Sequence, residues 1–152
     1  MQYNRGIRFI LEENALSRII NPESAGKERT HLSKAIVLAV REMVLQSEPG
    51  IESHDLAAFI ILALEKIAAT IDISVAAWEK RDYWVKADKF RMEWAWAGLL
   101  AKNMRAGLRK EDWGEVAVVA AQAAQNLNKI SVAPGNRLGK PWVGAWEVLK
   151  NN

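Results

Sequence analysis

The chain has 152 residues, half of them hydrophobic and 26% charged, with a formal net charge of +3. This balance predicts one globular domain over residues 1–152 that needs no metal or disulfide for stability. Cysteine is absent, which excludes a disulfide framework, a thiolate metal site and a cysteine nucleophile. The N-terminus does not resemble a signal peptide, and no apolar run approaches the ~20 residues that span a bilayer. We therefore expect a cytoplasmic protein with no membrane partner.

Two helices are predicted before residue 50. Apolar residues over 6–20 share one broad side, and Pro22 ends that helix because the residue before a proline is disfavoured in the helical region. Ser24 is a candidate N-cap for a second helix that runs to about residue 46. Residues 47–50, Ser-Glu-Pro-Gly, have the composition of a turn.

The longest predicted element covers residues 53–109. Residues 51–97 contain neither glycine nor proline, and an apolar residue recurs every seven positions, at Leu64, Ile71, Trp78, Val85, Met92 and Leu99. This spacing predicts a helical stripe. The element is either one long helix or two nearly collinear helices with a kink around residues 79–82, and the other helices are expected to pack against it.

Two shorter helices complete the prediction. Asp112-Trp113-Gly114-Glu115 resembles a capping box and starts a helix to about residue 130 that has no charge over 116–128. After a loop at 131–140, Pro141 begins a short helix that carries Trp142 and Trp146. No segment alternates with a period of two for long enough to predict a strand. The predicted fold is therefore all-α, a compact bundle of five or six helices around one long central helix (or kinked helix pair), with no sheet.

The sequence offers little for catalysis or for a cofactor. Di-iron bundles need two Glu-x-x-His pairs, and Glu28 with His31 supplies only one. Residues 135–140 depart from the P-loop pattern, and no Gly-x-Ser-x-Gly motif occurs. We expect no cofactor, no metal and no catalytic residue. A pocket between helices that uses Glu65, Asp72 or the histidines stays as an alternative.

A basic helix face that also carries tryptophans is the one candidate site whose residues are predicted, from helical spacing, to lie on the same side of a helix. Residues 77–152 hold thirteen Lys or Arg against eight Asp or Glu, a net +5, and all seven tryptophans. At about 100° per residue, seven side chains fall in a stripe about 80° wide, namely Lys80, Trp84, Arg91, Trp94, Lys102, Arg105 and Arg109. Such cations can follow phosphates, and the rings can stack on bases. In the alternative interpretation, the tryptophan rings belong to the hydrophobic core and the charged side chains lie around its edge.

The favoured function is that of a small non-enzymatic helical-bundle protein that acts through its surface, as a homo-oligomer or as a subunit of a larger complex. The absence of a catalytic constellation, the number of tryptophans and the uncharged helix over 116–128 support it. Trp142 and Trp146 are candidate interface residues, on this chain or on a second subunit. The alternatives are an accessory nucleic-acid-binding subunit that uses the basic stripe, and a ligand-binding or enzymatic pocket between helices.

Overall fold

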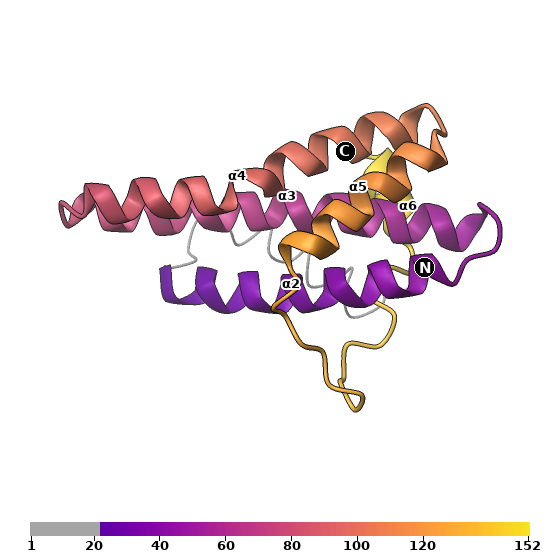
Figure 1. Cartoon of the computed structure of the whole chain (residues 1–152), viewed down its shortest axis with the longest axis horizontal. Helices are drawn as coiled ribbons and strands as arrows, with labels where there is room; N and C mark the ends of the chain where they lie inside the picture. Colours follow the sequence, from indigo (N-terminus) through magenta and orange to yellow (C-terminus); the bar gives the residue numbers. More distant parts are fainter. Residues whose placement is uncertain (1–21) are drawn as a thin grey trace.

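The computed structural model describes residues 22–152, which form a helical bundle without strands (Figure 1). The helices are α2 (Pro22–Val44), α3 (Ile51–Lys80), α4 (Trp84–Arg109), α5 (Trp113–Asn126) and α6 (Ala145–Lys150). The predicted all-α fold class is thus confirmed. The helix predicted over residues 6–20 lies outside the described part of the chain.

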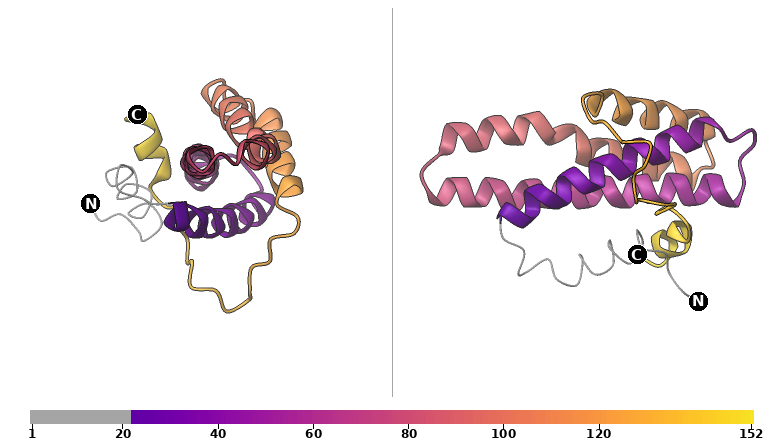
Figure 2. Two further views of the ribbon diagram at one scale, coloured as in Figure 1. Left: turned by 90° about the vertical axis from the view of Figure 1, so that its left-hand side faces the viewer. Right: turned by 90° about the horizontal axis from the view of Figure 1, so that it is seen from below.

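Helix α3 is the centre of the bundle. It contacts α2, α4, α5 and α6, and in the end-on view of Figure 2 it lies among these helices. Every side chain from Asp55 to Leu64 is buried, because this stretch is apolar nearly all round. Leu32 and Ile36 of α2 are buried in the same core.

The long predicted element is two helices, and the break lies where the kinked alternative placed it but has a different geometry. After Lys80 the chain turns over residues 81–83, and α4 returns antiparallel along α3 (Figure 1). The Tyr83 amide donates to the Trp78 carbonyl (2.9 Å), and Asp82 takes a left-handed φ of 62°. The two helices are therefore a hairpin and not nearly collinear. The reversal needs no glycine or proline because aspartate tolerates this conformation better than most residues.

Helix α5 begins where the capping motif predicts. The Asp112 side chain accepts a hydrogen bond from the Glu115 amide (3.1 Å), which satisfies one of the free amides at the helix start. Helices α4 and α5 approach closely at Gly107. A Cβ there would lie 3.3 Å from Cγ of Glu115 and 3.5 Å from Cγ2 of Val116. Glycine at this position therefore permits the close packing of α4 against the start of α5.

Helix α6 is held by the start of α3. The buried carboxylate of Asp55 accepts hydrogen bonds from the amides of Gly144 (3.1 Å) and Trp146 (3.0 Å). Gly144 has a φ of 88°, a conformation that glycine adopts at no steric cost. A single side chain of α3 thereby fixes both the entry turn and the first turn of α6. Within residues 22–152, no helix is long and apolar enough to cross a membrane.

Candidate interaction surface on helix α4

Helix α4 has apolar side chains on two opposite sides. Its inner side packs on α3 through buried residues, which are Ala87, Ala97, Leu100, Ala101, Met104 and Leu108. Val85, Met92 and Leu99 point the other way and are 84%, 78% and 59% exposed. An ordinary surface helix carries one apolar stripe toward the core, so a second stripe on the far side is unusual.

The heptad series seen in the sequence is therefore divided between two environments. Leu64 and Ile71, on α3, are buried in the core. Val85, Met92 and Leu99, on α4, continue the same spacing but lie outside. The reversal at 81–83 explains the difference, because it changes which side of the second helix meets the first.

Two aromatic rings extend this surface to the tip of the hairpin. Tyr83 and Trp84 are 54% and 55% exposed, and they line an open depression together with Val85, Lys86 and Lys89. We call the set Tyr83, Trp84, Val85, Met92 and Leu99 the outer face of α4. It holds five of the ten large hydrophobic side chains that are exposed in the described chain. Clustering of this kind marks interaction sites, whereas single exposed hydrophobic residues are ordinary.

The predicted basic stripe is only partly assembled. Lys80 ends α3, whereas the other six residues lie on α4. Arg91 binds Glu79 (2.7 Å) and Asp88 (2.6 Å), and Arg105 binds Glu65 (2.6 Å). Exposed pairs of this kind add little stability, but they cancel positive potential that phosphates would need. Lys102 and Arg109 are exposed.

The two tryptophans of the stripe have different environments. Trp84 is exposed at the tip, as base stacking requires. Trp94 is half-buried, stacked on Trp96 (5.6 Å between ring centroids) and covered by the Arg29 guanidinium at 5.7 Å. Trp94 therefore packs as the core interpretation expects, and Trp84 is the ring available to a partner.

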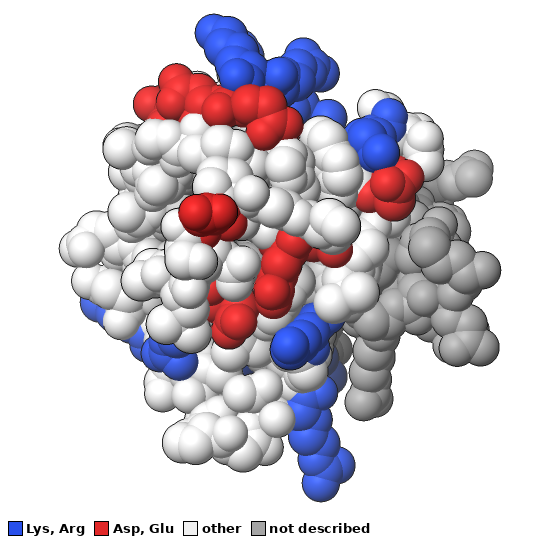
Figure 3. Space-filling model, turned by 90° about the vertical axis from the view of Figure 1, so that its right-hand side faces the viewer, with Lys and Arg blue, Asp and Glu red and all other residues white. Residues whose placement is uncertain are grey.

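The far end of the bundle has a different chemical character. Viewed from that end, the surface carries acidic and basic side chains interspersed among uncharged ones (Figure 3).

Among the described residues, no group of three or more histidines or carboxylates is placed to hold a metal ion. A cavity of about 170 Å³ lies between α4 and α6, lined in part by Arg109 and Trp146. Ligand pockets usually hold about 300–1,000 Å³.

Trp142 and Trp146 both dock on this same chain. The Trp142 side chain is buried, at 2% exposure. Trp146 is half-buried, and its ring centroid lies 5.1 Å from that of His54. Their role in an interface with a second subunit stays a prediction, and only the partly exposed Trp146 could contribute area to one.

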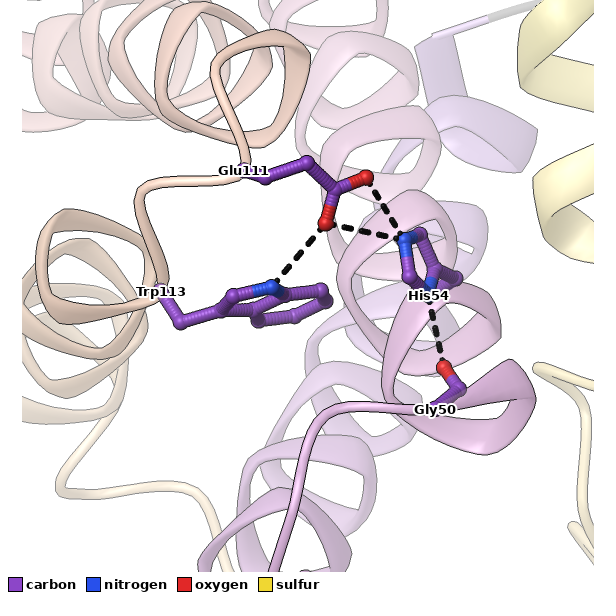
Figure 4. A network of polar contacts seen from close by, with 4 residues as sticks. All are labelled: Gly50, His54, Glu111 and Trp113. Carbon is purple, nitrogen blue, oxygen red and sulfur yellow. Dashed lines mark hydrogen bonds and ion pairs between the residues drawn. The ribbon is translucent and has the colours of Figure 1, made fainter.

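His54 joins three parts of the bundle (Figure 4). Its Nε2 donates to Glu111 (2.9 Å), and its Nδ1 donates to the Gly50 carbonyl (2.7 Å). Both ring nitrogens face acceptors, so only the protonated ring satisfies both contacts. Glu111 also accepts a hydrogen bond from Trp113 Nε1 (3.0 Å). This network fixes the corner between α4 and α5 against the start of α3.

The network makes stability depend on pH. Burial alone would lower the pKa of His54, but the hydrogen bonds to Glu111 and Gly50, with the nearby negative charges of Glu111 and Asp55, raise it overall. The folded state therefore holds this proton more tightly than the unfolded state. The stabilisation is complete below the unfolded pKa of about 6.5 and is lost as pH rises through the folded pKa.

We expect the free energy of unfolding to fall as pH rises above about 6.5 and through the raised pKa of folded His54. Urea unfolding followed by tryptophan fluorescence measures it. Glu111→Gln is the matched comparison, because the amide keeps the shape of the side chain and removes its charge. Its decline should be smaller, and equal declines in both proteins would contradict the role given to His54.

No family model, curated protein or solved structure matches the chain. Function must therefore be inferred from the geometry of the outer face of α4.

Sequence reasoning named Trp84 there but did not assign Tyr83, Val85, Met92 or Leu99 to a site. The heptad spacing of the last three was the available signal, and it was read as part of the stripe shared with residues now buried in α3.

Proposed function

We propose that this chain is a non-enzymatic helical-bundle subunit that binds another protein chain through the outer face of α4. One observation carries the proposal, which is the row of Val85, Met92 and Leu99 exposed on the side of α4 that is turned away from α3. Burying such a side chain stabilises a contact by about 1.5–3 kcal/mol relative to leaving it in water. The exposed rings of Tyr83 and Trp84 add the residue types that most often dominate interface energies.

The test is Met92→Lys, which places a charge in the middle of the row. The matched control is Val118→Lys, because Val118 is also exposed on a helix (52%) but lies on α5. We expect Met92→Lys to shift the protein toward monomer size, both purified and in extracts of cells that express the full chain, since an apolar contact tolerates an unpaired charge poorly. Val118→Lys should leave the size distribution unchanged.

Light scattering over a tenfold concentration range and size fractionation of native extracts supply the readouts. Far-ultraviolet circular dichroism should show the same helix content in all three proteins, because both positions are exposed. A wild-type chain of monomer size in the purified state and also in native extracts would overturn the proposal.

A second function is favoured by the charges at the hairpin tip. Lys86 and Lys89 line a depression with the exposed rings of Tyr83 and Trp84, and Asp82 lines it as well. Lys80, Arg81 and Asp88 are close to these residues in the sequence. Exposed rings among cations can bind single-stranded nucleic acid by stacking and phosphate contacts. This would place an accessory nucleic-acid-binding site at the tip and not along the whole predicted stripe.

For this second function we expect RNA to quench tryptophan fluorescence at about 50 mM salt and far less at about 300 mM salt. The probe is a mixed-sequence single-stranded RNA. Trp84→Phe should remove most of the quenching, and Lys86→Glu with Lys89→Glu should abolish binding. The comparison is Arg105→Glu with Arg109→Glu, which reverses charge at the far end of α4. Equal losses in both double variants would place the site along the whole helix, and no quenching at either salt would exclude it.

A further inference from the structure

The apolar row of α4 is symmetric about its middle residue. Val85 and Leu99 each lie seven residues from Met92. A spacing of seven keeps a row facing a neighbouring helix when the two helices supercoil. If a second α4 runs antiparallel across the first with a two-fold axis at Met92, each methionine meets its equivalent and each Val85 meets the partner's Leu99.

We infer that the docked protein is a second copy of this chain, paired through α4 in this antiparallel register. The inference rests on the proposed function and names the partner for the same surface. A two-fold axis requires one patch to be complementary to itself, and the row meets that requirement for its apolar residues.

The charges on one flank of the row fit the same register. At about 100° per residue, Lys89 and Glu93 lie about 60° and about 100° around the helix from Met92, on the same side of the row. Across a two-fold axis, a flank faces its own equivalent. Lys89 therefore lies within about 3 Å, along the helix axis, of the partner's Glu93, and the pairing occurs twice. Both side chains are exposed in the single chain.

The other flank also pairs unlike groups. Trp84 and Lys102 both lie about 80° from Met92 in the opposite sense, and their offset along the axis is again about 3 Å. Each ring then faces the partner's Lys102, an arrangement that favours a cation–π contact. Trp84 and Lys102 are both exposed. In this register the two Glu93 residues are also about 3 Å apart along the axis, with one Lys89 beyond each of them, so that the four charges on the first flank sum to zero.

The shape of the chain leaves room for the second helix. The first half of α4 runs along α3 to the hairpin tip, away from α5 and α6 (Figure 1). An antiparallel partner places its own α5 and α6 beyond the other end of the paired helices. The contact is one row wide, so we expect it to be weaker than a standard interface of about 1,200–2,000 Å², with a dissociation constant on the order of micromolar.

Single-cysteine variants test the register, because the natural chain has no cysteine. Under oxidised glutathione, Met92→Cys should form a disulfide-linked dimer. Val85→Cys alone and Leu99→Cys alone should not, because equivalent residues lie about 21 Å apart in this register and a disulfide needs Cα atoms within about 7 Å. A mixture of the Val85→Cys and Leu99→Cys proteins should cross-link.

Val118→Cys measures the collisional background, and Met92→Cys should cross-link at least about tenfold faster because docking raises the effective thiol concentration. Lys89→Glu should slow the Met92→Cys reaction, and adding Glu93→Lys should restore it. Self-linkage of Val85→Cys and of Leu99→Cys would show a parallel pair and overturn the register. Cross-linking of Met92→Cys no faster than background would overturn self-pairing.

The two proposals fail in different ways. A chain that shows no cross-linking but migrates in native extracts in a large complex that Met92→Lys removes has another protein on the outer face of α4. In that case self-pairing is wrong and the proposed function stands. A chain that shows no cross-linking and has monomer size in native extracts overturns both.

Discussion

Replacing Phe59 by alanine is expected to lower the free energy of unfolding by about 3–5 kcal/mol. Phe59 lies in the middle of the buried stretch of α3 and is 1% exposed. Removing the ring takes away its transfer free energy and also leaves a cavity, because surrounding helices relax only in part. Domains of this kind are stable by about 5–15 kcal/mol, so this one change removes a large fraction of the total.

Met92→Ala is the matched comparison for Phe59→Ala. It also truncates a large apolar side chain on a helix, but Met92 is 78% exposed. We expect its effect to stay within about 0.5 kcal/mol. Urea unfolding monitored by circular dichroism and fluorescence gives both values. A similar loss in the two variants would mean that the outer face of α4 is part of the core, and it would remove the basis of the proposed function.

Replacing Glu28 by methionine is expected to raise the free energy of unfolding by about 1–3 kcal/mol. Glu28 lies on α2, is 7% exposed, and neither of its carboxylate oxygens has a hydrogen-bond partner among residues 22–152. A buried polar group without a partner carries the full cost of leaving water, whereas methionine of similar length can fill the same space. Asp55, which is also buried, avoids this cost through its two hydrogen bonds to α6.

Glu42→Met is the control for Glu28→Met. Glu42 lies on the same helix but is only half-buried, so losing its charge should change the free energy of unfolding by no more than about 0.5 kcal/mol. Denaturant midpoints with unchanged m-values would report the difference directly. Destabilisation by Glu28→Met would contradict the expectation and would mean that the carboxylate is used by the folded protein.

Local signals predicted most of the helical architecture. The turn at 47–50 and the cap at Asp112 are each recognisable from a few neighbouring residues, and helices α3 and α5 begin within about two residues of them. Helix α2 begins at Pro22, so Ser24, the predicted N-cap, lies inside its first turn. The reversal at 81–83 has no comparable local signal. It contains neither glycine nor proline, and the turn is set by the packing of α4 on α3, which acts over the whole length of both helices.

The site was harder to predict because it depends on that reversal. The heptad row was visible in the sequence, but its exposure follows from the side of α4 that meets α3. The basic stripe was predicted along one helix, whereas the structure divides it between α3 and α4 and pairs Arg91 and Arg105 with carboxylates. The carboxylate that binds Arg105 comes from Glu65, forty residues earlier, and the periodicity of one helix cannot reveal such a partner.

The hydrogen bonds from α6 to Asp55 have a consequence for the order of folding. Helix α6 has only six residues, too few to be stable in isolation, and its anchoring bonds join residues 89 and 91 positions apart. Closing so long a loop is entropically costly, so these bonds should form after the hairpin of α3 and α4 has assembled. The same element should open first in the native state, and its amides should exchange with deuterium ahead of those in α3.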